Sequence, residues 1–356
     1  MKKVVIGMSG GVDSSVAAWL LKEQGYEVIG VTMQVWQDAA QYSDAAHDGE
    51  DIQAVIDAKR VAEQLGIPHY TLNFKKEFQE SVVANFVSEY LCGRTPNPCN
   101  LCNRYVKWEA LLNRARELGA DRIATGHYAR IVRLENGRYS LKKSVTAAKD
   151  QTYALCNLTQ DQLAHTLMPL GEYTKEEVRA MAEKIGIDVA NKPDSQEICF
   201  VPDHDYAAFI ERETGGRVPP EGNFVNPQGE VLGRHKGIIH YTIGQRKGLG
   251  IAFGKPVFVS EIRPETNEVV LGENEDIFKT ELFADNVNWM SVGDPAGGLR
   301  LNAKIRYAHK GAPCIVYPEP EGKVRVVFEE PQRAITPGQS VVFYDGDLVA
   351  GGGVIL

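Results

Sequence analysis

The feature that most constrains this chain is a glycine-rich run near its start, Gly7-Met8-Ser9-Gly10-Gly11-Val12-Asp13-Ser14-Ser15. It lies between a β-branched run at residues 3–6, typical of a buried parallel strand, and an apolar helix-forming stretch at residues 16–21. The glycines therefore stand where a strand becomes a helix. Because the first amides of a helix have no intrahelical partners and the helix dipole is positive there, this turn is a predicted anion site.

Two common phosphate-binding motifs do not match this run. No lysine follows the glycines at the position that the GK[ST] motif of ATPases requires, and the spacing does not fit the dinucleotide pattern GxGxxG. The run Ser-Gly-Gly-x-Asp-Ser resembles instead the loop of the PP-loop ATP pyrophosphatases, which cleave ATP between its α and β phosphates and use AMP to activate a carbonyl-type oxygen. The plainer alternative is an ordinary turn with Asp13 as a helix N-cap. The order strand, loop, helix favours the nucleotide site.

Composition limits the remaining possibilities. A chain of 356 residues predicts two or three domains, and 43% hydrophobic and 24% charged residues are ordinary for a globular protein. No apolar run of 18 residues and no signal-peptide pattern occur, so we expect a cytoplasmic protein that does not enter a membrane. We also expect it to be a monomer. Six cysteines are too few for a disulfide scaffold, and in a reducing compartment they are predicted to be thiols, ligands or catalysts. The net charge of −8 argues against nucleic-acid binding by bulk attraction but allows a local basic face.

Strand and helix patterns alternate through the first part of the chain. Strands are predicted at residues 27–32, 69–73 and 121–125, and helices at 51–65, 76–91 and 104–118, with a polar connection at 36–50. This alternation predicts an α/β fold with a doubly wound parallel sheet. The resemblance to the PP-loop enzymes implies such a sheet as well, like that of the adenine nucleotide alpha hydrolases. A hairpin around Asn136-Gly137 and a capping box at residues 174–177 follow.

The character of the chain changes beyond about residue 205. Short β-rich runs broken by glycine and proline lead into almost continuous alternating strands from about residue 280 to the end. The first pattern indicates a small β-rich central domain, and the second a closed β-barrel. The predicted domains are therefore residues 1–204, 205–279 and 280–356.

Three cysteines lie in loops that suggest chemistry. Cys99 and Cys102 stand at the start of a predicted helix, and Cys199 lies where a polar loop runs into an apolar turn. A thiol at a helix N-terminus is expected to have a lowered pKa and to be a good nucleophile or ligand. The CxxC spacing alone allows either half a zinc site or coincidence, since no second CxxC occurs. Cys92, Cys156 and Cys314 are predicted to be buried.

Together with several further motifs, these loops resemble the bacterial tRNA-specific 2-thiouridylases over nearly the whole chain. The motifs are residues 7–15, Gly93-Arg94-Thr95-Pro96-Asn97-Pro98, Cys102-Asn103, Ala124-Thr125-Gly126-His127-Tyr128-Ala129-Arg130, Lys149-Asp150-Gln151, Asp194-Ser195-Gln196-Glu197-Ile198-Cys199-Phe200, residues 241–248 and Arg306-Tyr307. Their combination is specific, although no single motif is.

The resemblance implies that the chain makes 2-thiouridine at the wobble position of tRNAs for Lys, Glu and Gln. It implies that ATP, with Mg²⁺ on its phosphates, is held by Gly7, Met8, Ser9, Gly10, Gly11, Val12, Asp13, Ser14, Met33 and Gly126. It further implies that Asn97, Pro98 and Cys99 meet the target base, and that Lys149, Asp150, Gln151, Arg306 and Tyr307 contact the tRNA.

The resemblance also assigns the sulfur chemistry. A cysteine desulfurase or a sulfur-relay protein delivers a persulfide to Cys199, which attacks the activated base, and Cys102 then releases the product by forming a disulfide with Cys199. Well-studied members carry an acidic residue where this chain has Cys99. That departure raises an alternative, in which Cys99, Cys102 and Cys199 hold three irons of a [4Fe-4S] cluster.

Other residues keep two interpretations each. Arg306 and Tyr307 could hold a phosphate and stack on a base, or be plain barrel surface on a strand. His127 could be a catalytic base or a loop histidine bonded to its own backbone. The sequence around Arg234-His235-Lys236 and Arg246-Lys247 suggests a local basic face.

Two other functions are compatible with part of the sequence. A PP-loop ligase that amidates a small molecule would leave Cys102, Cys199 and the β-rich third of the chain without a role. A non-catalytic RNA-binding iron–sulfur sensor would have no use for an intact pyrophosphate loop.

Overall fold

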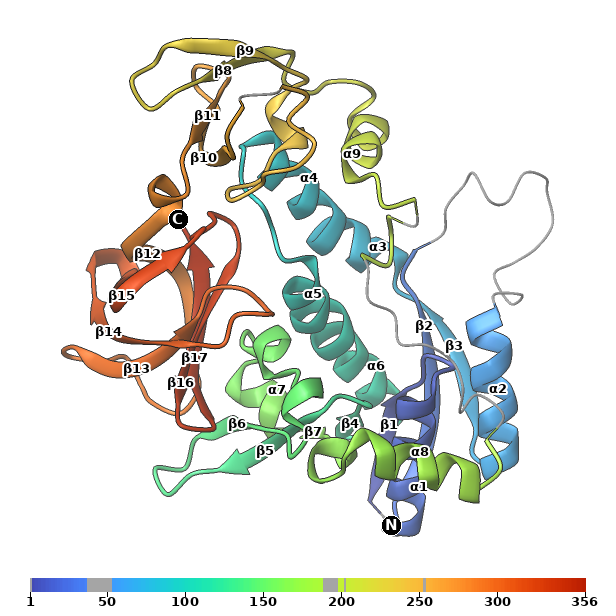
Figure 1. The fold of residues 1–356 in the computed structure, drawn as a ribbon. Coiled ribbons are helices and arrows are strands. Elements are labelled where there is room, and N and C mark those ends of the chain that lie inside the picture. The colour runs from blue at the N-terminus through green and yellow to red at the C-terminus, as the bar shows by residue number, and fades with distance from the viewer. Residues whose placement is uncertain (1, 37–52, 188–197, 202, 252–253) are drawn as a thin grey trace. The chain divides into compact units, whose positions relative to one another are not determined.

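The computed structural model describes residues 2–36, 53–187, 198–201, 203–251 and 254–356 (Figure 1). Contacts between residues divide the chain into two units. The first comprises Met1–Val82, Cys99–Phe200 and Asp347–Ala350, and the second Val83–Pro98, Val201–Gly346 and Gly351–Leu356. The predicted domain limits remain a prediction, and most of the connection at 36–50 lies outside the described residues.

The first unit is built on a five-stranded sheet in the order β3-β2-β1-β4-β7. All its pairings are parallel. The strands are β1 (Lys3–Gly7), β2 (Glu27–Gln34), β3 (His69–Asn73), β4 (Arg122–Ala124) and β7 (Thr166–Leu167). The predicted parallel α/β sheet is therefore confirmed, and β7 is a short edge strand that the sequence did not reveal.

Helices flank this sheet. They are α1 (Val12–Glu23), α2 (Gln53–Leu65), α3 (Lys75–Phe78), η1 (Gln79–Val83), η2 (Cys102–Ala110), α6 (Leu111–Glu117), α7 (Gln160–Ala164) and α8 (Lys175–Lys184), with short turns η3 (Ala147–Lys149), η4 (Thr152–Leu155) and η5 (Pro169–Glu172). Helices α1, α2 and α8 share one apolar core with β1 and β2. Figure 1 shows α2 and α6 on opposite sides of the strands, as a doubly wound sheet requires.

Two local predictions in this unit are confirmed. Strands β5 (Ala129–Arg133) and β6 (Tyr139–Lys143) form an antiparallel hairpin whose turn contains Gly137 at φ +81°. Helix α8 begins at a complete capping box, in which Thr174 accepts from the Glu177 amide and Glu177 accepts from the Thr174 amide.

The helix around the two vicinal cysteines differs from the prediction. We expected it to start near residue 104, but α5 (Pro98–Leu101) begins it at Pro98, where a proline is tolerated because the first helical amide needs no partner. It continues as η2, a π-helix of nine residues that starts at Cys102. Helical segments with i→i+5 hydrogen bonds are rare in proteins, and those that occur often lie at functional sites.

The second unit contains two β structures. A four-stranded sheet has the order β10-β11-β8-β9, with β8 (Gly222–Val225), β9 (Val231–His235), β10 (Phe258–Arg263) and β11 (Glu268–Gly272). Its core contains Phe224, Tyr241 and Val259. Helices α4 (Ala84–Leu91) and α9 (Tyr206–Thr214) and the turns η7 (Ile238–His240), η8 (Glu275–Ile277) and η9 (Pro320–Gly322) complete the unit.

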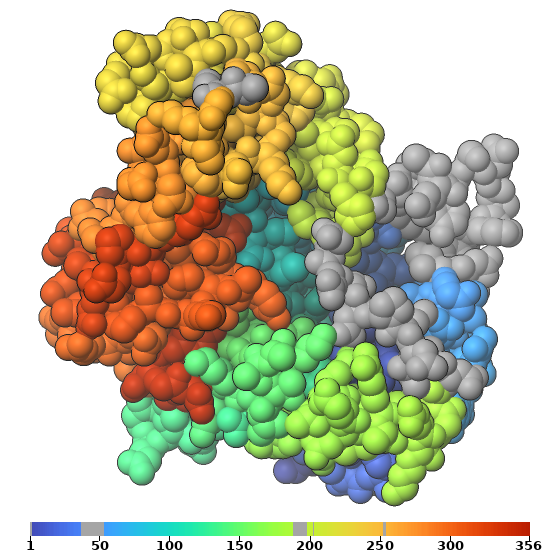
Figure 2. All heavy atoms as spheres, in the orientation of Figure 1, coloured from blue at the N-terminus to red at the C-terminus, as the bar shows by residue number. Residues whose placement is uncertain are grey.

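The predicted C-terminal barrel is confirmed. Its strands are β12 (Phe278–Trp289), β13 (Leu299–Lys304), β14 (Ala312–Pro318), β15 (Val324–Arg333), β16 (Ser340–Asp345) and β17 (Leu348–Ile355). The order β12-β15-β14-β13-β16-β17 closes because β12 also pairs with β17, with Ala284 opposite Ile355. Figure 2 shows the atoms of this C-terminal segment in orange to red.

Candidate functional site

The glycine-rich loop connects β1 to α1 as the sequence predicts. Gly11 is the N-cap of α1 and, as a glycine, provides no side chain to cap this helix end. Gly10 has φ +69°, and a Cβ atom at this position would lie 2.4 Å from the carbonyl oxygen of Ala54. Both the backbone conformation and the lack of space therefore require glycine. The loop is fixed by its surroundings, and its N-cap residue has no side chain that could occupy the first amides of α1.

The serine side chains of the glycine-rich loop form hydrogen bonds to the backbone of the same loop. Ser14 Oγ accepts a hydrogen bond from the Ser9 amide at 3.2 Å and donates to the Gly11 carbonyl at 3.2 Å, and Ser15 Oγ donates to the same carbonyl at 2.8 Å. These contacts shape the turn between strand and helix in the same way as an ST-motif does. Both hydroxyls are buried, so their first role is to keep the anion site in shape.

Two residues predicted to hold ATP lie beside this loop. A Cβ atom on Gly126 would lie 2.7 Å from the Ser14 amide nitrogen, so the backbone after β4 can approach the start of α1 only because residue 126 has no side chain. Met33 Cε lies 3.5 Å from the corresponding position on Gly7. The structure thus brings Gly7, Met33 and Gly126 to the same end of the parallel sheet, the end where such sheets bind ligands.

Asp13 is not the N-cap that the plainer interpretation suggested. Its carboxylate accepts hydrogen bonds from Lys175 Nζ at 2.8 Å on both oxygens and from the Tyr128 hydroxyl at 2.8 Å. Lys175 is the first residue of α8 and is 5% exposed. No individual role for Lys175 or Tyr128 could be predicted from the sequence. The capping box located the start of α8 but could not reveal its contact with a residue 162 positions earlier.

The three candidate thiols all belong to the first unit. Cys99 and Cys199 are exposed, and Cys102 is 9% exposed at the start of η2. The thiols are close enough to influence one another, because Cys199 and Cys99 both contribute to the pKa of Cys102. Cys92 is exposed, so its predicted burial is wrong, whereas Cys156 and Cys314 are buried as expected.

Burial raises the pKa of two of these thiols, and for Cys102 this is opposite to our prediction. It raises the pKa of Cys102 to about 11, with smaller raising effects from Cys199 and Cys99 and an opposing effect from the Lys107 ammonium. Burial also raises the pKa of Cys199, and Cys99 raises it further. The Cys199 side chain nevertheless reaches solvent. The expected lowering by a helix N-terminus fails for Cys102 because the helix already begins at Pro98.

The three thiols do not form a metal site in this arrangement. Within the described residues, which include Cys99, Cys102 and Cys199, no group of three His, Cys, Asp or Glu side chains could hold a metal ion. The donors required for an iron–sulfur cluster are therefore present in the sequence but are not assembled around a common point.

An aromatic cluster fixes the chain directly after Cys199. The Phe200 ring centroid lies 5.4 Å from that of Phe78 and 6.1 Å from that of Trp36. Phe200 is buried, whereas Cys199 beside it is exposed. This anchor holds the backbone at Cys199 and leaves the thiol accessible. The residues from Asp194 to Glu197 that precede it in the motif lie outside the described part of the chain.

His127 does not have the properties of a catalytic base. Burial, and then the Lys107 charge, lower its pKa to about 3. Its Nδ1 lies 2.9 Å from Thr125 Oγ1, and its ring packs against Trp108 with centroids 5.3 Å apart. We expected His127 to bond to its own backbone, but its hydrogen-bond partner is the Thr125 side chain. A neutral imidazole with so low a pKa accepts a proton poorly at neutral pH.

Two of the predicted tRNA-contacting residues in the first unit also make internal bonds. Asp150 accepts from the Ser144 amide at 3.0 Å and from the Thr152 hydroxyl at 2.6 Å. Gln151 Oε1 accepts from the Tyr128 amide at 2.8 Å. These contacts tie the turn after β6 to the segment that carries Tyr128, so the two side chains order the surface on which Lys149 lies.

In the second unit, the loop before Cys99 is held by a turn of the barrel. Gln339 Nε2 donates to the carbonyls of Thr95 at 2.9 Å and Pro96 at 3.1 Å, and the Thr95 amide donates to the Pro337 carbonyl at 2.8 Å. Asn97 and Pro98, the predicted target-base residues in this unit, follow directly. The barrel therefore orders the backbone that leads into them.

Other predicted contacts in this unit need correction. Arg306 and Tyr307 do not lie on a strand, because β13 ends at Lys304 and the turn that follows carries both. Arg306 donates to the Arg333 carbonyl at 3.0 Å, whereas the Tyr307 side chain is 52% exposed. His235 is buried against the Asn267 carbonyl and does not contribute to a basic face, although Arg246 and Lys247 are exposed.

Comparison with known proteins identifies the family. Residues 2–203 match the family described as the tRNA methyl transferase HUP domain, residues 207–273 its PRC-barrel domain, and residues 279–355 the aminomethyltransferase β-barrel domain. The tRNA-specific 2-thiouridylase MnmA of Lachnoclostridium phytofermentans is 64% identical over 100% of both chains, and that of Acetivibrio thermocellus 58% over 99% of both. The chain belongs to the MnmA family of tRNA-specific 2-thiouridylases.

Solved structures resemble this chain only weakly. NMN synthetase from Francisella tularensis aligns over 60% of this chain and 78% of its own, with a TM-score of 0.35 and 18% identity. In the described part of the chain, no helix has the length and apolarity needed to cross a membrane.

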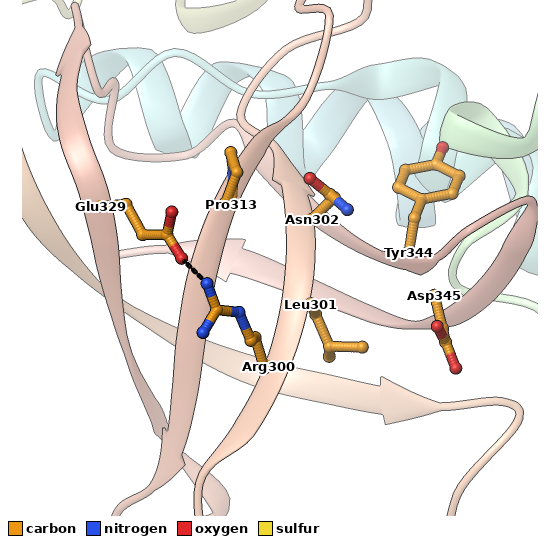
Figure 3. A pocket seen from close by; sticks show the side chains of 7 residues that line it. All are labelled: Arg300, Leu301, Asn302, Pro313, Glu329, Tyr344 and Asp345. Atoms are coloured by element: carbon orange, nitrogen blue, oxygen red, sulfur yellow. Dashed lines mark hydrogen bonds and ion pairs between the residues drawn. The ribbon is translucent and has the colours of Figure 1, made fainter.

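The barrel of this MnmA-family chain carries a surface hollow that no predicted site residue lines. Arg300, Leu301, Asn302, Pro313, Glu329, Tyr344 and Asp345 line it (Figure 3). Its one basic group, Arg300, is paired with Glu329, as the dashed line in Figure 3 shows. With Asp345 also at its rim, the hollow has no spare positive charge for a phosphate and no group suited to thiol chemistry.

Proposed function

We propose that this chain is a tRNA-uridine 2-sulfurtransferase that uses ATP to convert the wobble uridine of tRNAs for Lys, Glu and Gln to 2-thiouridine. The observation that carries the proposal is that a pyrophosphate-type loop and three neighbouring thiols belong to one folded unit. The full-length relatives named as 2-thiouridylases support the same conclusion. Both tRNA and ATP are cytoplasmic reactants, so we infer that the enzyme works in the cytoplasm. We further propose that it acts as a monomer.

In the first step, the uridine 2-oxygen attacks the α phosphorus of ATP. The bond to the β phosphate breaks, pyrophosphate leaves, and the base carries AMP on its oxygen. We infer that the amides at the start of α1 bind the departing phosphates. In this proposal the phosphate cradle is formed by Gly7, Met8, Ser9, Gly10, Gly11, Val12, Asp13 and Ser14, with Met33 and Gly126 beside it. The described residues hold no group of three side chains that could bind a metal ion. The ATP phosphates would therefore supply most of the ligands of a Mg²⁺ ion, and the charge of the ion would offset the negative charge of the phosphates.

In the second step, the outer sulfur of a persulfide on Cys199 attacks C2 of the base, and AMP leaves. The Cys102 thiolate then attacks Cys199 Sγ, a disulfide forms between the two cysteines, and the base departs with the sulfur as its C2 thiocarbonyl. A reductant must cleave the disulfide before the next cycle. The exposed Cys199 is accessible to a cysteine desulfurase or a sulfur-relay protein, whereas Cys102 is shielded.

We propose that base recognition involves Asn97, Pro98 and Cys99, and that Lys149, Asp150, Gln151, Arg306 and Tyr307 contact the tRNA. The exposed Tyr307 ring offers a stacking face, and anticodon-loop bases can be splayed out for such recognition. A [4Fe-4S] cluster on Cys99, Cys102 and Cys199 is the less favoured route, because these thiols do not form a metal-holding group here.

The decisive measurement is pyrophosphate release from ATP by the purified enzyme with unmodified tRNA. We expect release only when tRNA is present. Release that depends on an amine substrate instead would indicate a small-molecule ligase, and no release under either condition would indicate a non-catalytic RNA-binding protein.

Replacing the proposed sulfur carrier tests the second step. Cys199→Ala should abolish 2-thiouridine formation, measured by nucleoside mass spectrometry, while ATP binding is unchanged. The matched control is Cys92→Ala, which removes another exposed thiol outside the site and should retain activity. Thiolation by the Cys199→Ala enzyme would contradict the persulfide mechanism.

A further inference from the structure

An almost fully buried ammonium group lies beside the predicted triphosphate site. The Lys175 side chain is 6% exposed, and its Nζ contacts both carboxylate oxygens of Asp13 at 2.8 Å. The Tyr128 hydroxyl donates to one of the same oxygens at 2.8 Å, and the ammonium lies 5.7 Å from the centre of the Tyr128 ring. Two independent segments, one before β5 and one at the start of α8, thus converge on a single carboxylate.

This arrangement answers an electrostatic problem at the start of α1. Asp13 is the second residue of that helix, next to the amides that we propose to receive the phosphates of ATP. An unpaired carboxylate there would be stabilised by the helix dipole, but it would repel a triphosphate at close range. The contact with Lys175 makes the pair neutral overall, and burial of the ammonium limits screening by solvent.

The geometry also accounts for the unusual placement of a lysine. A charged amine at the first turn of a helix faces the positive end of the helix dipole, which is unfavourable, and burial adds a desolvation cost. Both costs are offset where the ammonium meets a carboxylate bidentately and faces an aromatic ring. The capping box of Thr174 and Glu177 sets the helix start, and hence the position of this amine.

We propose that Lys175 is the charge-compensating residue of the triphosphate site, which neutralises Asp13 so that ATP can approach the start of α1. Tyr128 holds the carboxylate in the orientation that meets the ammonium. This inference rests on the proposed function, because it requires that ATP bind at the glycine-rich loop. In this role Lys175 is a positioning residue that acts through Asp13.

A double-mutant cycle on ATP affinity tests this role. ATP binding to the full chain is measured by calorimetry without tRNA and in EDTA, so that no divalent cation can replace the lysine charge. We expect Lys175→Met to weaken ATP binding about 10- to 100-fold, because an uncompensated carboxylate then faces the phosphates. Adding Asp13→Asn to that variant should restore the affinity to within about threefold of the wild type.

Each outcome of the cycle bears on the proposal. If Lys175→Met binds ATP as the wild type does, the proposal is wrong. If the double variant is as weak as Lys175→Met alone, the lysine acts on the phosphates directly and charge compensation is overturned. Lys184→Met, at the exposed far end of α8, is the matched control and should bind ATP normally.

A second variant keeps the test decisive if Lys175→Met does not fold. Asp13→Asn alone leaves the ammonium without its carboxylate, so ATP should bind about threefold or more tightly in EDTA than to the wild type. Unchanged or weaker binding by folded Asp13→Asn overturns the proposal. If the wild-type chain itself binds no ATP, with or without Mg²⁺, the proposed function fails rather than this inference.

Discussion

The buried thiol of Cys102 should remain protonated at neutral pH. Its pKa is raised from 9.0 to about 11, chiefly by burial. Since each pKa unit changes the thiolate population tenfold, about one molecule in 1,000 carries the Cys102 thiolate at pH 8, against about one in ten for an unshifted thiol. Alkylation of Cys102 at pH 8 should therefore be about 100-fold slower through its protonation state alone.

The assay is the pH dependence of alkylation by iodoacetamide, followed for each cysteine by peptide mass spectrometry. The shape of the profile separates acidity from access, because restricted access lowers the rate equally at every pH. In the native protein we expect the alkylation rate of Cys102 to rise until about pH 11. In denaturant the rate should level off near pH 9, the ordinary pKa of a thiol. A native profile that levels off near pH 9 would refute the reasoning.

Protein stability gives an independent check on the same shift. A folded-state pKa above the unfolded value means that the native thiol holds its proton more tightly. The resulting stability is fully present below about pH 9 and is lost as the pH rises towards 11. Between pH 8 and pH 10.5 the wild type should lose about 2 kcal/mol more than Cys102→Ala in urea unfolding. An equal loss in both proteins would contradict the shift.

Three further predictions concern neighbouring residues. Lys107→Met should move the Cys102 alkylation profile to higher pH, because the Lys107 ammonium opposes the rise in that pKa. Gly126→Ala should lower stability by about 2 kcal/mol or more in urea unfolding, because its Cβ atom would lie 2.7 Å from backbone. The control Gly293→Ala has open space and should change stability by less than about 0.5 kcal/mol. Cys99→Asp should retain thiolation activity when the protein is purified anaerobically and contains no iron. If thiolation requires iron in the wild type and is lost in this variant, the result would support the iron–sulfur cluster.

The parts of the fold that could be predicted from sequence are those set by local patterns. The strand before Gly7, the helix after it and the capping box at Thr174 each depend on neighbours within a few residues. The closed barrel also follows from local alternation, since six strands with one apolar face have few other ways to bury it. The two-residue strand β7 carries no such pattern and was missed.

The parts that could not be predicted depend on distant contacts. The Lys175 and Asp13 side chains meet across 162 positions, and no local pattern marks a lysine at a helix start as a partner for a loop carboxylate. The Cys102 pKa was predicted with the wrong sign because the cysteine motif suggested a helix start. The helix begins four residues earlier, and tertiary packing buries the thiol. Burial is a property of the whole fold, and it outweighs the local dipole.

The contrast between the two thiols bears on the order of sulfur transfer. Cys199 is exposed and can be loaded by a donor, whereas Cys102 is buried, and burial raises its pKa to about 11. A protonated thiol does not attack a persulfide, so the loaded Cys199 would be protected from premature disulfide formation. The nearby Lys107 ammonium opposes this protection without removing it. In the proposed cycle, any event that opens Cys102 to water would lower its pKa towards 9 and raise its thiolate population about 100-fold. Release of the thiolated base would then depend on that opening.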